Sequence, residues 1–264
     1  MDREPAVAGR FYSGEPGALR REVDRFLGAG GEKVAAKGVV VPHAGYVYSG
    51  AIAGAVFARV EVPSRVVILG PNHTGLGHPV ALWPDGAWRL PSGDVPVDAA
   101  LTGALAAGPP VERDREAHLR EHALEVQVPF LSRARPDVAI AALCLGHLRF
   151  ADCQAVGKTV ARAAREAGAL VVASSDMSHY VSAEAAREKD HHAIERILAL
   201  DARGLYDVVH RENISMCGII PATVMLVAAV ELGATRAELV RYGNSGEVNG
   251  DMRQVVGYAG ILVA

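Results

Sequence analysis

Four apolar, strand-like runs in this chain are each followed by a histidine. The runs and their histidines are 38–41 with His43, 66–69 with His73, 138–145 with His147, and 170–173 with His179. A continuous apolar run of this length is typical of a strand buried on both faces, as in a parallel sheet. Ligands of open α/β sheets bind beyond the carboxyl ends of the strands. The pattern therefore predicts a metal or acid–base site at one edge of a parallel sheet.

Segments with helical patterns alternate with these runs. They cover 16–28, 48–60, 98–107, 116–133, 151–167, 183–200, 202–209 and 221–232, and further strand-like segments cover 238–242 and 254–263. This alternation predicts an α/β fold with a largely parallel central sheet and helices on both faces. No linker-like segment divides the 264 residues, so we expect a single domain covering 1–264.

Charge and cysteine content narrow the class of protein. A formal net charge of -3 provides no basic field for nucleic acid. No apolar run reaches the roughly 20 residues that span a bilayer, and no signal-peptide pattern follows the polar N-terminus. The three cysteines form no Cys-x-x-Cys motif, which argues against a disulfide framework. We therefore expect a cytoplasmic protein that binds neither nucleic acid nor a membrane.

The first two strand-end histidines and one cysteine are candidate metal ligands. His43 follows Pro42, and His73 follows a Gly-Pro-Asn turn. Neutral imidazole is the commonest metal ligand, although a loop histidine also commonly bonds a carbonyl oxygen. Cys217 lies just before the apolar helix at 221–232, and a helix N-terminus favours a thiolate. Cys217 is therefore the predicted reactive or metal-binding cysteine.

Two further pairs are candidates for acid–base or pocket roles. Asp176 and His179 are three residues apart, so the carboxylate could orient the imidazole. Capping of a following helix by Asp176 is the simpler alternative. His122 and Glu125 fall on one face of the predicted helix 116–133, where one or both could line the pocket. A Ser-His-Asp hydrolase is disfavoured because no Gly-x-Ser-x-Gly elbow is present.

Taken together, the motifs resemble those of the MEMO family, whose prokaryotic members are called AmmeMemoRadiSam system protein B. The resemblance covers nearly the whole chain. The segments that carry it are 5–12 (PAVAGRFY), 42–46 (PHAGY), 69–73 (LGPNH), 121–130 (EHALEVQVPF), 174–179 (SSDMSH), 217–218 (CG) and 242–246 (YGNSG).

The resemblance implies a fold similar to the class III extradiol dioxygenases of the LigB type. It implies that His43, His73 and Cys217 bind one transition-metal ion, iron or copper, with zinc as the alternative. It also places Asp176 and His179 nearby as acid–base residues. The dioxygenases use two histidines and a carboxylate, whereas a cysteine takes the place of the carboxylate here. A functional link to radical-SAM and AMMECR1-type proteins is a further implication.

Two hypotheses of different classes follow. The first is a metal-dependent redox enzyme that acts on a small-molecule ligand, with His122 and Glu125 lining its pocket. The second is a non-catalytic module that binds a peptide or other ligand in the same pocket, or that stores or delivers a metal. Metal binding requires deprotonated ligands, so chelators and low pH distinguish metal-dependent from metal-free binding.

Overall fold

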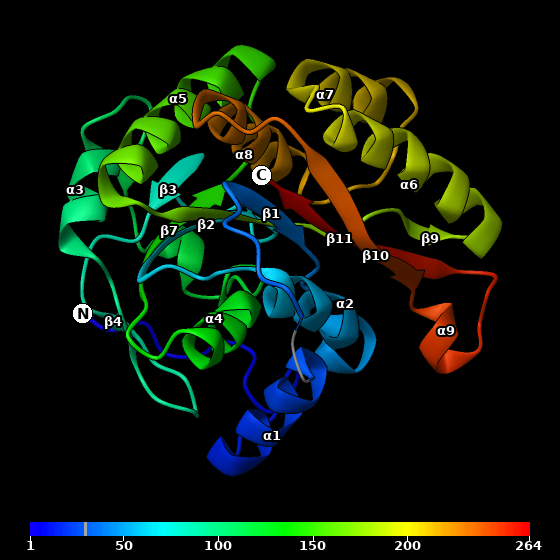
Figure 1. The fold of residues 1–264 in the computed structure, drawn as a ribbon, viewed down its shortest axis with the longest axis horizontal. Coiled ribbons are helices and arrows are strands. Elements are labelled where there is room, and N and C mark those ends of the chain that lie inside the picture. Colours follow the sequence, from blue (N-terminus) through cyan, green and yellow to red (C-terminus); the bar gives the residue numbers. More distant parts are fainter. Residues whose placement is uncertain (29–30) are drawn as a thin grey trace.

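A mixed sheet forms the centre of the protein in the computed structural model, which describes residues 1–28 and 31–264 (Figure 1). The strand order is β10-β11-β1-β8-β2-β7-β3-β6, and β9 pairs with β11 beside this path. The strands are β1 (Gly38–Val41), β2 (Arg65–Pro71), β3 (Val80–Leu82), β6 (Glu112–Arg113), β7 (Ala139–Leu145), β8 (Leu170–Ser174), β9 (His179–Val181), β10 (Ala237–Asn244) and β11 (Val255–Val263). A separate pair is formed by β4 (Ala87–Trp88) and β5 (Val95–Pro96).

The four neighbouring strands β1, β8, β2 and β7 are parallel. Val39 lies opposite Val172, and Val67 lies opposite Val171, so β-branched side chains fill both faces of this part of the sheet. All residues of β1 and β8 are buried. These are the strands predicted from the apolar runs, and the expected single α/β domain with a largely parallel sheet is confirmed.

Helices cover both faces of the sheet (Figure 1). On one face lie α1 (Pro16–Leu27), α2 (Tyr46–Arg59) and α4 (Val128–Ala134). On the other lie α3 (Ala99–Ala106), α5 (Phe150–Ala167), α6 (Ala183–Leu198), α7 (Ala202–Arg211) and α8 (Ile219–Glu231). A short helix, α9 (Gly246–Asn249), follows β10. In the described part of the chain, no helix is both long enough and apolar enough to cross a membrane.

The predicted continuous helix over 116–133 is wrong. This segment contains two 3₁₀ turns, η1 (Glu116–His118) and η2 (Glu125–Gln127), and only then α4. The side chain of Glu121 accepts hydrogen bonds from the backbone N–H groups of His122 and Ala123. Side-chain bonds of this kind compete with the helical pattern. The segment 119–124 is therefore an irregular loop at the carboxyl edge of the sheet.

Candidate metal centre

Three side chains with metal-binding atoms converge at the carboxyl edge of the parallel strands. His43 lies two residues beyond β1, His73 two residues beyond β2, and Cys217 two residues before α8. One donor atom of each lies within 4.8 Å of a donor atom of the other two. Because β8 lies between β1 and β2, its carboxyl end brings Asp176 to the same place. The three predicted ligands are thus close enough to share one ion.

The turn that carries Cys217 packs tightly against the end of β8. The Sγ atom of Cys217 lies 3.2 Å from Nε2 of His43 and accepts a hydrogen bond from the N–H of Asp176 at 3.3 Å. A Cβ atom on Gly218 would lie 2.3 Å from Cβ of Ser175 and 2.5 Å from the carbonyl oxygen of Ser174. Glycine at this position therefore allows the thiol to reach the cluster.

Hydrogen bonds fix the tautomer of His43. The Ser174 hydroxyl donates its single proton to the carbonyl of Ala123 at 2.6 Å and accepts from Nε2 of Gln127 at 2.9 Å. The Nδ1 atom of His43, 2.9 Å from the same hydroxyl, must therefore be the donor. Burial lowers the pKa of His43 to about 3, so the ring is neutral. Its Nε2 carries no proton and faces Sγ of Cys217 at 3.2 Å, so its lone pair becomes available to a metal when the thiol turns away or loses its proton.

A buried carboxylate, that of Glu121, likewise holds a proton on Nδ1 of His73. Glu121 accepts hydrogen bonds from Nδ1 of His73 at 2.9 Å and from its backbone N–H at 2.7 Å. Although burial opposes ionisation, the hydrogen bond from His73 helps to lower the pKa of Glu121 to about 2. Burial likewise acts to lower the pKa of His73, but the bond and charge of Glu121 raise it overall. A carboxylate that holds Nδ1–H is a common partner of a metal-binding histidine.

His122 lies against both imidazoles. Its ring stacks on that of His73 with centroids 4.7 Å apart and meets that of His43 at 5.4 Å. Burial and the nearby His43 lower the pKa of His122 to about 4, so this ring is neutral near pH 7. His73, Glu121 and His122 also form a geometric cluster. Both oxygens of Glu121 already accept N–H donors, so this second cluster is a poorer metal site.

Asp176 is buried beside the cluster, but it orients His43 rather than His179. Its Oδ1 accepts the backbone N–H of His43 at 2.8 Å, and its Oδ2 lies 3.9 Å from Nε2 of that ring. Burial raises the pKa of this carboxyl. The predicted bond between Asp176 and His179 is absent because Nδ1 of His179 bonds the carbonyl of Ser215 at 2.8 Å. His179 therefore also presents a free Nε2.

Glu125 does not line the site with His122, which corrects the second predicted pair. The helix that would have aligned them is absent, and Glu125 is fully buried in an ion pair with Arg3. His147 is exposed and belongs to neither of the two clusters found among the described residues. The four strand-end histidines therefore do not all meet at one point.

The protonation state of Cys217 differs from the thiolate that the sequence predicted. Burial, reinforced by the charge of Asp176, raises its pKa well above the ordinary value. This effect outweighs the helix N-terminus that was expected to favour a thiolate. The metal-free protein therefore carries a protonated thiol at neutral pH, and a bound cation would have to displace its proton.

Sequence reasoning missed Glu121 and Ser174 as supporting residues. Glu121 adjoins His122 in the sequence but bonds His73, which is 48 positions away. Ser174 ends β8 and bonds His43, which is 131 positions away. In the sequence, Glu121 could be noticed only as an acidic residue next to the candidate His122, and this position suggested a contact with His122 rather than with His73.

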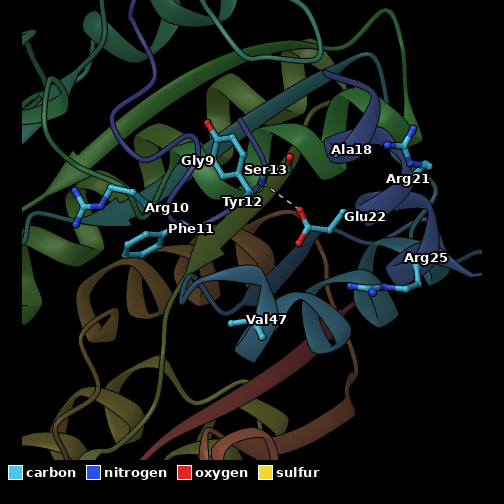
Figure 2. A pocket seen from close by; sticks show the side chains of 10 residues that line it. All are labelled: Gly9, Arg10, Phe11, Tyr12, Ser13, Ala18, Arg21, Glu22, Arg25 and Val47. Atoms are coloured by element: carbon cyan, nitrogen blue, oxygen red, sulfur yellow. Dashed lines mark hydrogen bonds between the residues drawn. The ribbon is translucent and has the colours of Figure 1, made fainter. Parts of the chain in front are cut away.

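A surface hollow of about 570 Å³ adjoins the cluster through one aromatic residue. Figure 2 shows Arg10, Phe11 and Tyr12 on the N-terminal segment, with Arg21 and Arg25 across the hollow on α1. The ring of Phe11 lies 4.8 Å from that of His122. His43, His73 and Cys217 do not line this hollow.

Fold and site together define an α/β protein with a candidate His/Cys metal centre at the carboxyl edge of its sheet. The family model described as "Memo-like protein" matches residues 3–262, and the chain belongs to this family. It is 44% identical to a "MEMO1 family protein" of Aquifex aeolicus over 98% of each chain. It is 46% identical to one of Methanococcoides burtonii over 99% of each chain.

A solved structure shares the fold at low sequence identity. The crystal structure of uncharacterized protein JW3007 from Escherichia coli K12 matches with a TM-score of 0.53 and 14% identity. The match covers 83% of this chain and 98% of that one. At this level of identity the likeness supports the architecture alone.

Proposed function

We propose that this protein binds one transition-metal ion through Nε2 of His43, Nε2 of His73 and Sγ of Cys217, and that it is a metal-dependent redox enzyme. The observation that carries the proposal is the convergence of three donor atoms within 4.8 Å. The hydrogen bonds to Ser174 and Glu121 also support the proposal. They hold the proton of each neutral ring on Nδ1 and so leave Nε2 to bind the metal.

The donor set favours iron or copper, with zinc as the alternative. Imidazole suits all three metals, while a thiolate is a soft ligand that favours Cu(I), zinc and iron. When bound, iron or copper would supply electron transfer and polarise a coordinated substrate. Three protein ligands leave positions open for that substrate. The substitution of Cys217 for the carboxylate of a facial triad argues for chemistry that differs from ring-opening dioxygenation.

Polar residues around the cluster could hold and move protons. The carboxyl of Asp176 is buried, and its raised pKa favours the protonated form more than in an exposed aspartate. His179 is half-buried, and its bond from Nδ1 to the carbonyl of Ser215 leaves Nε2 as a hydrogen-bond acceptor. His122 is neutral and contacts both candidate histidine ligands. These residues are the candidates for acid–base steps on a bound substrate.

Metal quantification tests the binding proposal. Protein purified anaerobically without chelator should contain close to one equivalent of iron or copper per chain. The variants His43→Ala, His73→Ala and Cys217→Ala should each lose most of it. His147→Ala is the matched control, because this histidine also follows a strand but lies outside the cluster. Equal metal content in all four variants and the wild type would overturn the assignment.

Turnover distinguishes the enzyme from a metal-handling or peptide-binding module. Oxygen uptake by the metal-loaded protein should depend on a reducing substrate, with catechols as the first panel, and should disappear in Cys217→Ala. A metal-loaded protein without turnover on any substrate would support the module. The small-molecule or peptide ligand and the functional link to radical-SAM and AMMECR1-type proteins stay predictions.

A further inference from the structure

Arg3 is a fully buried cation that bonds the backbone of the loop beside the candidate metal centre. Only 1% of the residue is exposed. Its guanidinium donates to the carbonyls of His118 at 3.0 Å and Glu121 at 2.5 Å and to the carboxylate of Glu125 at 2.6 Å. The group also lies 4.3 Å above the ring of Trp88. Such a planar fork can hold several acceptors in a fixed arrangement, which a lysine cannot do.

Glu125 completes this buried pair and ties it to the N-terminal segment. Its carboxylate accepts the backbone N–H groups of Ala6 at 2.7 Å and Val7 at 3.1 Å and the hydroxyl of Tyr12 at 2.7 Å. The ion pair is therefore compensated by hydrogen bonds on both sides. A buried pair with this many partners holds the surrounding backbone in one arrangement.

The loop between η1 and η2 has no helix of its own, and Arg3 bonds the carbonyls of His118 and Glu121 at its start. The same residue, Glu121, offers its carbonyl to Arg3 and its carboxylate to Nδ1 of His73. Arg3 is thus two hydrogen bonds away from a candidate metal ligand. Movement of the Glu121 backbone would move the carboxylate that orients His73.

We propose that Arg3, paired with Glu125, is a positioning residue for the metal centre, which it serves by holding the loop that carries Glu121 and His122. The inference rests on the proposed metal-binding function. It adds that the N-terminal segment belongs to the site, although none of its residues is a candidate ligand. A purely structural role for the pair is the alternative to exclude.

Two variants separate these roles. Arg3→Lys keeps the charge but loses the fork that bonds both carbonyls, and Tyr12→Phe removes a single bond to Glu125 and serves as the milder change. The matched control is Arg89→Lys. Arg89 also ties down the N-terminal segment, through Asp2 and Glu4, but on the surface and without contact to Glu121.

Two measurements are made on each full-length variant. One is the Zn²⁺ affinity from chelator competition, together with the absorption spectrum of the Co²⁺-loaded protein. The other is the imidazole tautomer in the metal-free protein, from long-range ¹H–¹⁵N NMR at a pH high enough for the His73 ring to be neutral, since, against the effect of burial, Glu121 raises its pKa. We expect Arg3→Lys to weaken Zn²⁺ binding about 10-fold or more. It should also alter the Co²⁺ spectrum and mix the tautomers of His73 while His43, held by Ser174, keeps Nδ1–H.

A general loss of stability would leave the tautomers of the folded fraction unchanged. If Arg3→Lys keeps the wild-type tautomer of His73 and the wild-type Zn²⁺ affinity, the positioning role is overturned. Equal effects in Arg89→Lys would overturn it as well. If wild-type protein binds no metal, the proposed function fails, and the His73 tautomer in the metal-free variants alone decides the positioning role. Tyr12→Phe should shift both readouts in the same direction by a smaller amount.

Discussion

The sulfur of Cys217 lies 3.2 Å from Nε2 of His43, the ring atom that its hydrogen bond to Ser174 leaves without a proton. In the proposed metal site, the thiol of Cys217 still carries a proton, whereas Nε2 of His43 does not. Burial raises the pKa of this thiol and lowers that of His43 to about 3. The pair should therefore bind a cation with release of a proton from sulfur rather than from nitrogen.

Metal affinity should consequently rise with pH. Cys217 releases one proton on binding, and His73, whose pKa is raised, contributes part of a second wherever its ring is protonated. We expect the association constant for Zn²⁺ to rise by about 10- to 100-fold per pH unit between about pH 6 and pH 8. Titration calorimetry in buffers of different ionisation enthalpy counts the protons. Cys217→Ser should release one fewer, and an unchanged count would contradict the thiol as a ligand.

Ser174→Ala should weaken metal binding by freeing the His43 proton. Without the hydroxyl acceptor, the proton can move to Nε2 and compete with the ion. We expect a loss of about 10- to 100-fold in Zn²⁺ affinity, as for other residues that support a metal-binding histidine. Chelator competition measures this loss. Ser132→Ala is the control, because that hydroxyl bonds a carbonyl within α4. Wild-type affinity in Ser174→Ala would show that the tautomer is held by other contacts.

His118 should make stability fall in mild acid. Burial, aided by the charge of Arg3, lowers its pKa from the ordinary 6.5 to about 4. Between these values the unfolded chain binds more protons than the folded one, so stability decreases as pH falls. The slope from this one group approaches about 1.4 kcal/mol per pH unit.

Urea unfolding at several pH values measures this slope. His118→Gln can keep the bond to the carbonyl of Ala81 but cannot titrate, so its stability should depend less on pH between about 6.5 and 4. His147→Gln, at an exposed site, should leave the slope unchanged. An identical slope in His118→Gln and the wild type would mean that His118 is solvated or protonated in the folded protein.

Tyr180 should be replaceable by glycine without loss of stability. This exposed residue next to His179 has φ 59°, a left-handed conformation that disfavours side chains with a Cβ atom. We expect Tyr180→Gly to change the free energy of unfolding by between 0 and about +1 kcal/mol, because relief of strain exceeds the added chain entropy. Asn213→Gly is the control, since asparagine already tolerates φ 49°. A clear destabilisation by Tyr180→Gly would show that the tyrosine ring makes stabilising contacts.

The sequence was sufficient for the four parallel strands at the centre of the sheet and for the three candidate ligands, because both depend on local patterns. Apolar runs mark strands buried on two faces, and parallel strands necessarily bring their carboxyl ends, with His43 and His73, to one edge. Cys217 was recognisable from its place before an apolar helix and from the family resemblance. Its raised pKa was not, because burial depends on the packing of the Cys217 turn against β8.

The supporting residues could not be predicted because their partners are distant in the chain. The periodicity of 116–133 predicted a helix, but Arg3 takes two carbonyls of this segment and the Glu121 side chain takes two of its N–H groups. These contacts outweigh helix propensity. The spacing of Asp176 and His179 likewise implied a mutual bond, yet Asp176 turns to the backbone of His43.

The position of β11 in the sheet has a consequence for biosynthesis. This strand pairs with β1, and its Gly257 exchanges backbone hydrogen bonds with Met177 and Ser178, the residues that connect Asp176 to His179. All three candidate ligands are translated before β11, but the segment between Asp176 and His179 lacks its support until β11 is added. A ribosome-bound chain that ends before residue 255 therefore holds every candidate ligand in an incomplete site. Under the proposed function, metal loading is expected to follow translation of β11.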